Sequence, residues 1–404
     1  MIALYLTATT TVFFQLSFVL LIIRNYRYIL DKSRKPRKVY RPKTALIVPC
    51  KGLDIEFERN IQSFYHQDYE NYELLFVTES ADDPAYEKLE QIKNAMADKS
   101  KALDVRLLVA GIAENGSQKL HNLLCAYRNI SDGVIVMAFA DSDAYIAENW
   151  LEHIVHPLRK SKIGVTSGYR WFVPCENNIA TLALSAVNAK VAQNLGATPF
   201  NQAWGGSMAV RVDTFESLGI EEIWKKAISD DLTLSRAARK AGKRIIFVPA
   251  CFVASYEKIT WRGFLEFGRR QFLITRVTLP GTWWFGVLSG FFSVFGFWGL
   301  AIIAAIVGFS GSGCWLLFAV CSAIFLACQE LRAVIRQKMI FKLLPKDAEK
   351  MKVAAAADII GNPIWSLILL ALIISSAVGR SICWRGVKYR LKGATEVIRV
   401  EDKD

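Results

Sequence analysis

The sequence has little of the chemistry that many soluble enzymes use to bind transition metals or to form covalent intermediates. It contains four histidines among 404 residues, and its eight cysteines form no CxxC pair, which argues against a zinc site of paired cysteines. Neither a GxxxxGKS/T loop nor a GxSxG elbow occurs, so a P-loop nucleotidase and a serine hydrolase have no support. Charged residues amount to 22% and hydrophobic residues to 52%, a composition that excludes a disordered chain and a disulfide mini-protein.

The first apolar run, residues 4–23, is almost uncharged and long enough to cross a bilayer as a helix. A cleaved signal peptide would need a basic segment before this run and a small-residue cleavage site after it, and neither is present. The following residues, 24–43, are dense in Lys and Arg, and the positive-inside rule places them in the cytoplasm. We therefore expect residues 1–23 to form a retained anchor and residues 24–43 a basic juxtamembrane segment.

Membrane character returns over residues 285–379, where three further runs could span a bilayer: 286–309, 314–329 and 364–379. The basic link at 331–352 is expected in the cytoplasm. Three crossings after a cytoplasmic domain would place the basic C-terminal tail, residues 380–404, outside, against the same rule. One run could instead be re-entrant or split, with a break at Gly361-Asn362-Pro363, so the number of crossings stays open.

The middle of the chain has the pattern of a soluble α/β domain, which we place at residues 44–260. Short β-branched apolar runs alternate with helical stretches such as residues 84–100. This alternation predicts a mostly parallel, Rossmann-like sheet with helices on both faces and a ligand site at the carboxyl ends of its strands. Several cysteines lie in apolar runs, which predicts reduced thiols in an intracellular domain. The expected strands are residues 44–50, 72–80, 104–110 and 132–140.

Two pairs of aspartates could carry chemistry. Asp141 and Asp143 directly follow the fourth predicted strand, where two carboxylates could share Mg²⁺ or Mn²⁺ and so neutralise a nucleotide diphosphate. Asp230 and Asp231 open a stretch with helical spacing. In that second pair, Asp230 or the preceding Ser229 could simply be the helix N-cap, or one aspartate could be a general base pointed into a cleft.

Other polar residues lie beside the predicted strand ends. Glu79, Asp82 and Asp83 end the second strand and could bind the base or sugar of a nucleotide, or could form a polar loop that caps the helix beginning at Pro84. Lys119, at the start of another predicted helix, could meet phosphate charge or could be an ordinary surface lysine.

Taken in order, these segments resemble the family-2-type glycosyltransferases with the GT-A fold, and within them the ceramide glucosyltransferases. The resemblance runs from about residue 44 to the end of the chain. It rests on the ordered motifs PCKGLD (49–54), ESADDPAY (79–86), QKLHNL (118–123), DSD (141–143), WGGSMAVR (204–211), SDDL (229–232) and WRGVKYRLKG (384–393). The (Q/R)xxRW motif of the family corresponds to residues 267–271, where only Arg270 is kept, and this departure leaves the acceptor lipid open.

The resemblance implies an inverting transfer of a hexose, first of all glucose from UDP-glucose, onto a membrane lipid hydroxyl, first of all that of ceramide. It makes Asp231 the general base, with Asp230 and Arg270 beside it, and puts a divalent cation on Asp141 and Asp143. The residues expected to hold the nucleotide and its charge are Glu79, Asp82, Asp83, Lys119, Asp141, Arg385 and Arg390. It also implies a multi-pass membrane protein with its catalytic domain on the cytoplasmic face.

A mixed basic and aromatic stretch, residues 261–284, precedes the second apolar run. We interpret it as an interfacial helix that shapes the acceptor entrance, although a plain juxtamembrane anchor would have the same composition.

Several alternatives remain in view. A transferase acting on a hopanoid or diacylglycerol would share most of these features, whereas a polysaccharide synthase would need more crossings and an intact QxxRW motif. A non-catalytic membrane scaffold or transporter with a degenerate transferase domain belongs to a different class, and the lack of ionisable residues in the apolar cores at 286–309 and 314–327 argues against transport. The net charge of +13 lies largely in the membrane-flanking segments and the tail, so a nucleic acid partner is not expected. The oligomeric state is left open.

Overall fold

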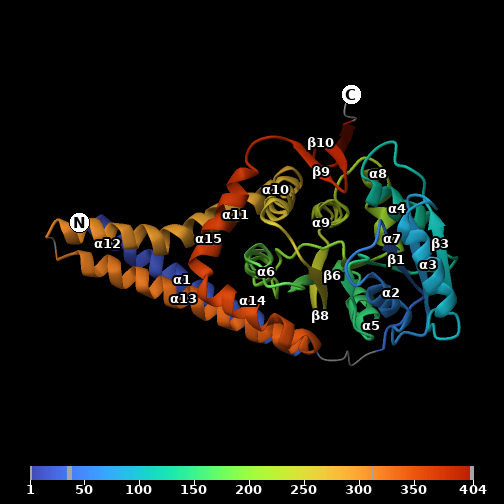
Figure 1. Ribbon diagram of the computed structural model, residues 1–404, viewed down its shortest axis with the longest axis horizontal. Coiled ribbons are helices and arrows are strands. Elements are labelled where there is room, and N and C mark those ends of the chain that lie inside the picture. The colour runs from blue at the N-terminus through green and yellow to red at the C-terminus, as the bar shows by residue number, and fades with distance from the viewer. Residues whose placement is uncertain (1, 34–38, 312, 401–404) are drawn as a thin grey trace.

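The computed structural model describes residues 2–33, 39–311 and 313–400. It divides into a mixed α/β domain and a group of long helices that extends to one side of it (Figure 1). The amino terminus lies at the far end of the long helices, whereas the carboxyl terminus lies beside the α/β domain.

An eight-stranded sheet in the order β3-β2-β1-β4-β7-β6-β8-β5 forms the centre of the α/β domain. Strands β3, β2, β1 and β4 are parallel to one another, β6 is parallel to β8, and β7 and β5 run antiparallel to their neighbours. The expected mostly parallel α/β sheet of a GT-A domain is therefore confirmed. The strands are β1 (Thr44–Pro49), β2 (Tyr72–Thr78), β3 (Asp104–Val109), β4 (Val136–Ala140), β5 (Ala144–Tyr145), β6 (Ile163–Pro174), β7 (Ser207–Arg211) and β8 (Arg244–Glu257).

Both faces of the sheet are covered, which explains why its central strands consist of continuous apolar runs. Along β1, Leu46 and Val48 enter the core on one face, whereas Ala45 and Ile47 enter the core on the other. The first core is completed by α2 (Phe57–Tyr65), α3 (Pro84–Ala95) and α5 (Trp150–Val155). The second is completed by α4 (Gln118–Arg128), α7 (Val212–Ser217), α8 (Ile220–Trp224) and α9 (Asp230–Lys240).

The four strands expected from the sequence all form, with β4 beginning at Val136 instead of residue 132. Because β2, β1 and β4 are parallel neighbours, their carboxyl ends meet at one edge of the sheet. The acidic segments at 79–83 and 141–143 follow two of these strands and are thereby brought to the same edge.

The membrane part begins with α1 (Ile2–Lys32), a single helix that continues well past the end of the predicted anchor. Three helices are long and apolar enough to cross a membrane within the described residues: Thr9–Lys32, Pro280–Phe309 and Trp315–Leu343. The second combines α11 (Pro280–Val294) and α12 (Leu300–Phe309) through one π-helical turn, and the third is α13 (Trp315–Leu343). Much of the basic link expected at 331–352 is therefore the end of α13.

The last apolar run is broken. Helices α14 (Ala348–Ile360) and α15 (Asn362–Ser375) meet at an angle of 84° at Gly361, the break expected from Gly361-Asn362-Pro363. The bend is held by a buried ion pair between Arg336 of α13 and Asp358 of α14, with nitrogen–oxygen distances of 2.6 and 2.7 Å. Lys190 joins this junction from α6 (Ile179–Ala192) by donating a hydrogen bond to Ser366 of α15.

The C-terminal tail is an ordered three-stranded sheet of β9 (Ser381–Trp384), β10 (Val387–Gly393) and β11 (Glu396–Val400). It packs on the α/β domain, where the backbone N–H of Val397 donates to the carbonyl of Lys226 at 2.8 Å. The tail and the α/β domain therefore lie on the same side. The bent pair α14–α15, which lies between α13 and the tail, has the form of a broken span or a re-entrant segment.

The stretch expected as one interfacial helix over 261–284 is divided. Helix α10 (Trp261–Thr278) ends before Leu279-Pro280, and the remaining residues begin α11. Proline at the first position of α11 fits this division, because the missing N–H costs nothing at a helix start and breaks the preceding helix.

Candidate active site

A large cavity of about 1680 Å³ lies between the carboxyl edge of the sheet, α9, α10 and the membrane helices. Its polar end is lined by Lys119, Asp141, Asp143, Asp230 and Asp231. From there it continues to apolar side chains of α1, α11 and α15, such as Phe18, Phe292 and Ile373. One cavity thus joins the acidic residues singled out in the sequence to the membrane part.

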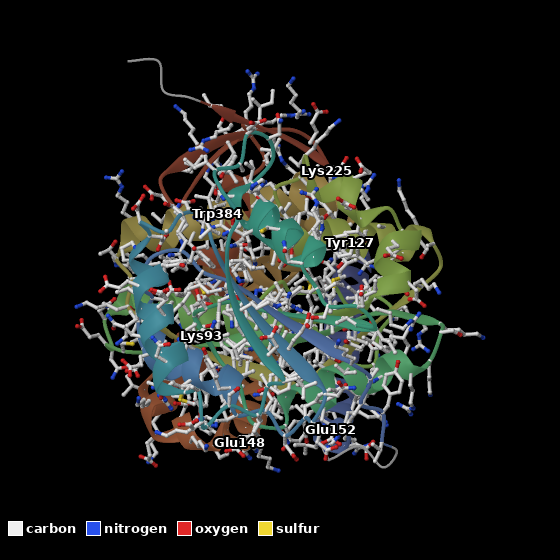
Figure 2. The ribbon with its side chains drawn as sticks, turned by 90° about the vertical axis from the view of Figure 1, so that its right-hand side faces the viewer. Lys93, Tyr127, Glu148, Glu152, Lys225 and Trp384 are labelled. Atoms are coloured by element: carbon white, nitrogen blue, oxygen red, sulfur yellow. The ribbon has the colours of Figure 1, made fainter. Side chains whose placement is uncertain are left out.

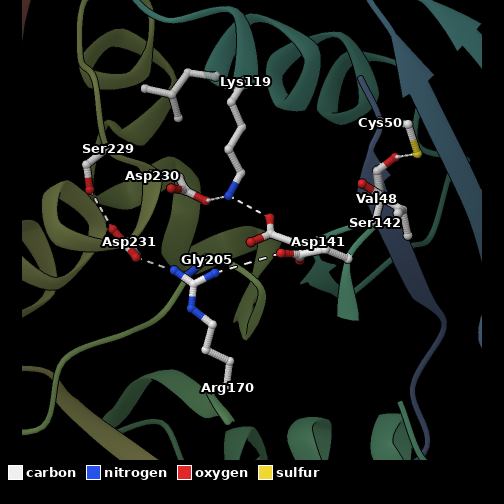
Figure 3. A network of polar contacts seen from close by, with 12 residues as sticks. Val48, Cys50, Lys119, Asp141, Ser142, Arg170, Gly205, Ser229, Asp230 and Asp231 are labelled. Atoms are coloured by element: carbon white, nitrogen blue, oxygen red, sulfur yellow. Dashed lines mark hydrogen bonds and ion pairs between the residues drawn. The ribbon is translucent and has the colours of Figure 1, made fainter. Parts of the chain in front are cut away.

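Lys119 is the centre of the polar end and lies between two carboxylates (Figure 3). Its Nζ is 2.7 Å from Asp141 Oδ1 and 3.0 Å from Asp230 Oδ2. Burial works against a charged lysine here, but the two carboxylates outweigh it and raise the Lys119 pKa. Burial also raises the pKa of Asp230, to about 6, with Asp231 adding to the effect and Lys119 opposing it. The position of Lys119 at the start of α4 is set by Ser117, whose side chain caps that helix.

Asp143 faces Arg170 of β6, with 3.8 Å between Asp143 Oδ2 and Arg170 Nη1. The Arg170 guanidinium also stacks on aromatic rings, 4.7 Å from the Phe172 centroid and 5.2 Å from that of Trp204. Burial and the neighbouring Asp141 raise the Asp143 pKa to about 6, despite Arg170. Arg170 therefore supplies a fixed positive charge beside the two aspartates.

Asp231 lies half-exposed in the cavity wall, whereas Asp230 is 5% exposed. The Oδ2 of Asp231 accepts a hydrogen bond from the Gly205 N–H at 3.1 Å, and its Oδ1 accepts from the Leu232 N–H and the Ser229 hydroxyl. Ser229 is the N-cap of α9, one of the alternatives left open above. The capping role thus falls to the serine, and Asp231 is the more exposed of the two aspartates in the cavity wall.

Two glycines let the loop before β7 approach these acids closely. A Cβ at Gly205 would lie 2.1 Å from Asp230 Oδ2, and one at Gly206 would lie 2.3 Å from the Trp204 ring and 2.7 Å from Asp141 Oδ2. No side chain fits at either position without displacing its neighbours. The WGGS segment therefore has a steric reason for its two glycines.

The residues present fit a divalent cation at Asp141 and Asp143. Asp143 Oδ1 is buried and accepts no hydrogen bond from the described residues, so an acceptor oxygen is available there. No group of three His, Cys, Asp or Glu side chains within the described ranges could hold a metal ion by itself. A cation with one or two carboxylate ligands would need oxygens from a bound diphosphate, which is how Mg²⁺ is usually held.

The acidic residues after β2 lie beside the cavity without lining it. Asp83 caps α3 and also accepts a hydrogen bond from the Gly52 N–H at 2.8 Å. Glu79 pairs with Lys51 at 2.7 Å, and Lys51 does line the cavity. Asp82 is exposed and accepts from Ser80. Glu79 and Asp83 thus fix the loop after β1, and a direct contact of any of the three with a nucleotide stays a prediction.

Two of the three arginines expected at the site line the cavity. Arg270 of α10 contacts the Phe267 and Trp384 rings, and burial together with Arg170 lowers its pKa to about 10, which leaves it charged at neutral pH. Arg385 donates hydrogen bonds to the Lys51 carbonyl and to Asp54 Oδ1, both at 2.9 Å. Trp384, the last residue of β9 and labelled in Figure 2, closes this part of the wall.

Arg390 is not brought to the cavity. On β10 the side chains alternate, so Tyr389 and Leu391 are buried while Lys388 and Arg390 are exposed on the opposite face. The expected contact of Arg390 with the nucleotide therefore has no geometric basis.

Arg385 has a backbone conformation that is uncommon for its residue type. Its φ is 49° and that of Gly386 is 80°, the pattern of a two-residue hairpin turn between β9 and β10. The two bonds from its guanidinium to the β1 loop hold this turn against the cavity mouth.

Sequence reasoning missed two residues of the polar end, Arg170 and Asp54. Arg170 is an arginine inside a twelve-residue strand that is otherwise mostly buried, and this interruption was the available signal. Asp54 belongs to the PCKGLD motif, but nothing in the sequence indicated that it binds both Ser142 at 2.7 Å and Arg385.

Residues 2–397 match glycosyl transferase family 21. The chain belongs to that family. It is accordingly a glycosyltransferase, with candidate membrane-spanning helices beside its catalytic domain.

Two relatives from Caenorhabditis elegans are similar over part of their length. Ceramide glucosyltransferase 3 is 31% identical over 112 residues, which are 24% of either chain. Ceramide glucosyltransferase 1 is 29% identical over 103 residues, 24% of this family 21 chain and 21% of the relative. The chain thus matches under a quarter of the length of these curated relatives. Among solved structures, a mannosyltransferase from Pyrobaculum calidifontis in complex with GDP-Man and Mn²⁺ is 18% identical, with a TM-score of 0.45 over 93% of this chain and 97% of that one.

Proposed function

We propose that this family 21 transferase moves glucose from UDP-glucose onto the hydroxyl of a membrane lipid, with ceramide as the acceptor. The observation that carries the proposal is the single cavity that joins Asp231 and the other acids to apolar side chains of the membrane helices. The partial similarity to ceramide glucosyltransferases supports this choice of donor and acceptor.

The acceptor side of the cavity suits a molecule that keeps its chains in an apolar environment. Phe18 and Leu21 of α1 and Leu369 and Ile373 of α15 line it. Each CH₂ taken from a bilayer into water costs about 0.8 kcal/mol, so a lipid with ten exposed methylenes would lose about 8 kcal/mol. A cavity that continues into the membrane part avoids this cost, because only the headgroup has to reach Asp231.

Asp231 is the proposed general base. It faces the cavity, and its two backbone N–H partners fix its orientation. A base must be positioned within hydrogen-bond reach of the hydroxyl whose proton it takes, and its removal typically lowers the rate about 10²–10⁴-fold. Asp230 is occupied by Lys119 and would act by holding that lysine in place.

Asp141 and Asp143 would hold the cation, whose contribution is to neutralise the charge that develops on the departing diphosphate. Lys119, Arg170 and Arg270 supply fixed positive charge around the same space. Fixed charges stabilise a developing anion well, because they need no reorganisation during the reaction.

We further propose that the catalytic domain lies on the cytoplasmic side. The basic segments 24–43 and 331–352 flank membrane helices at the end nearer this domain, and the positive-inside rule assigns such segments to the cytoplasm.

The decisive assay incubates the purified full-length protein with several nucleotide sugars and a panel of lipids, and identifies the products by mass. A glucosylated ceramide formed only when Mg²⁺ or Mn²⁺ is present is the expected product. A glycosylated hopanoid or diacylglycerol would change the acceptor, and a polymer would indicate a polysaccharide synthase. The absence of any product from all donors would favour a non-catalytic scaffold.

The Asp231→Asn variant tests the role of the base in the same assay. Turnover is expected to fall about 10²–10⁴-fold while binding of the nucleotide is kept. Ser229→Ala serves as the matched control, because it removes one partner of Asp231 and leaves the carboxylate in place. Near-normal turnover in Asp231→Asn would exclude this residue as the base.

A further inference from the structure

The main cavity opens to the surface at two places. Among the described residues, five large apolar side chains both line the cavity and are exposed, and such a side chain marks a point where a cavity opens. Leu53 and Ile55 belong to the loop after β1. Val191, Phe200 and Phe285 belong to α6, the loop after it, and α11, and they define what we call the membrane mouth. The cavity therefore has one mouth at the α/β domain and another at the membrane helices.

The membrane mouth lies between α1 and α11. Each helix lines the cavity with side chains of one region: Phe18 and Leu21 from α1, and Phe285, Ser289 and Phe292 from α11. The rings of Phe18 and Phe292 meet with their centroids 6.0 Å apart, which closes the mouth on the side away from the α/β domain. Elsewhere α1 packs along α13 and α11 along α15, so different partner helices hold the two walls of the mouth.

The loop at 193–206 closes the mouth on the side of the α/β domain. It follows α6, which packs on both β6 and α15 (Figure 1). Arg24 of α1 donates a hydrogen bond to the Ala197 carbonyl at 3.4 Å, and Gln202 donates to Thr282 of α11 at 2.5 Å, so the loop bridges the two helices. At 1.5 Å per residue, the opening between these contacts and the ring pair measures about 9 Å along α1 and about 15 Å along α11. A whole helix with its side chains is about 10–12 Å wide, so the much thinner chains of a lipid fit this opening.

This loop has a fixed backbone, although one of its large apolar side chains is exposed. Asn201 is buried and donates to the carbonyls of Gly196 and Thr198 at 2.8 and 2.9 Å. Arg239 of α9 donates to the carbonyls of Phe200 and Asn201 at 2.8 and 2.7 Å. Phe200 is nevertheless 79% exposed. Ordered backbone therefore holds an aromatic ring outward at the rim of the cavity.

The surface around the membrane mouth is apolar as well. Leu20 of α1 is 67% exposed and Leu288 of α11 is 66% exposed. The two helices belong to the candidate spans Thr9–Lys32 and Pro280–Phe309. Large apolar side chains that are exposed along membrane-spanning helices face the hydrocarbon of a bilayer. The membrane mouth therefore opens toward lipid, whereas the mouth at the β1 loop opens from the α/β domain.

We propose that the membrane mouth is a lateral entrance, through which the acceptor lipid passes from the bilayer between α1 and α11 to reach the acids. The nucleotide sugar then uses the mouth at the β1 loop, so neither substrate has to leave before the other can enter. This inference rests on the proposed function, because it presupposes a lipid acceptor, and it adds the route of that lipid and the residues that frame it.

The test places a bulky side chain in the lateral entrance of the full-length protein in phosphatidylcholine nanodiscs. Ser289→Trp is expected to lower kcat/KM for long-chain ceramide in the same nanodiscs by about 10-fold to 100-fold, because it overfills the opening. A short-chain ceramide analogue added from water does not need the lateral route and is expected to keep its wild-type rate. Leu288→Trp is the matched control, since it adds the same bulk to the neighbouring residue, which does not line the cavity.

Phe200→Asp tests the rim without adding bulk. A carboxylate at the rim disfavours the passage of apolar chains, so KM for long-chain ceramide is expected to rise several-fold while kcat and the affinity for UDP stay unchanged. Ile179→Asp is its control, because Ile179 is an exposed apolar residue of α6 that does not line the cavity.

The outcomes separate this inference from the function on which it rests. Wild-type protein that glycosylates no lipid would overturn the proposed function itself. If wild type is active, unchanged transfer to long-chain ceramide in Ser289→Trp and Phe200→Asp would overturn the lateral entrance alone. An equal loss with the long-chain and short-chain acceptors would also overturn it, because the substitution would then disturb a step that both acceptors share. Melting temperature and UDP affinity report folding, and Phe200→Asp decides the question if Ser289→Trp does not fold.

Discussion

Replacing Lys119 by methionine removes the positive charge that joins two carboxylates at the polar end of the cavity. Methionine keeps much of the length of the lysine side chain, so the packing around α4 changes little. Asp141 and Asp230, at 2.7 and 3.0 Å from the lysine nitrogen, lose a partner that no other described lysine provides. Asp230 is nearly fully buried, so its carboxylate gains no hydration in compensation.

The size of the effect follows from these contacts. At about 3 Å and an effective dielectric constant of about 20, each pair contributes about 5 kcal/mol of attraction, much of which offsets the desolvation of the charges. Breaking a buried pair by removing one partner typically costs about 3–5 kcal/mol. A domain of about 200 residues loses about 2–4 °C of melting temperature per kcal/mol, so we expect a decrease of about 6–20 °C.

The pH dependence has a definite sign. Asp230 already has a pKa raised to about 6 with the lysine present, and removal of the lysine raises that pKa further. The penalty of the variant exists only where the carboxylate is ionised, because a protonated carboxyl needs no cation. The loss of stability should therefore be largest above pH 7 and should shrink as the pH falls below 6.

Thermal unfolding followed by tryptophan fluorescence in detergent micelles measures both effects. Lys119→Arg should stay close to wild type because it keeps the charge. Lys51→Met is the matched control, since it removes a lysine from the more exposed Glu79, where the cost should not exceed about 1 kcal/mol. A Lys119→Met protein that melts within about 2 °C of wild type, or equally low at pH 5 and pH 8, would refute the reasoning.

Three further outcomes are expected. Gly205→Ala should abolish turnover and lower the free energy of unfolding by about 1–3 kcal/mol, because the new Cβ would lie 2.1 Å from a carboxylate oxygen of Asp230. Gly281→Ala is the control: a Cβ there has no atom within 4 Å, so its turnover and melting temperature should match those of wild type. Asp143 must be ionised to hold a cation, and its pKa is raised to about 6. The Mn²⁺ affinity measured by calorimetry should therefore fall about tenfold per pH unit below pH 6, and an affinity that does not change with pH would contradict this prediction. Arg336→Met should lower the free energy of unfolding by about 3–5 kcal/mol, because it leaves the buried Asp358 carboxylate without its partner. The double variant Arg336→Met/Asp358→Leu should recover most of this loss in thermal unfolding. If it does not, the unpaired carboxylate is not the cause of the loss.

The α/β domain was predictable because both of its faces are buried. Continuous apolar runs such as residues 44–50 then appear as strands, and their alternation with helices fixes which strand ends meet. The acids at 141–143 could be placed at that edge for the same reason, whereas Asp230 and Asp231 open a helix and were assigned to the site only through the family resemblance. The break at Gly361 was also predictable, since a proline two residues later disrupts helical hydrogen bonding.

What the sequence did not reveal depends on contacts between segments that are far apart. The sequence did not separate Arg385 from Arg390, yet Arg385 lies in the turn between β9 and β10 and lines the cavity, whereas the alternation along β10 sends Arg390 to the opposite face. The side of the membrane on which the tail lies could not be decided from charge counts, because it depends on the contact of Val397 with the catalytic domain. Arg170 was missed because its partner Asp143 comes from another strand end.

The wall that β9–β11 add to the cavity has a consequence for biosynthesis. These strands follow Asp141 and Asp231 in the chain and therefore leave the ribosome after them. The catalytic domain can therefore fold while the membrane helices are still being inserted, but its reaction chamber stays open to water until β9–β11 have been made. A nascent chain, or one shortened by a premature stop codon, would carry the acids without the enclosure that directs the sugar to a lipid.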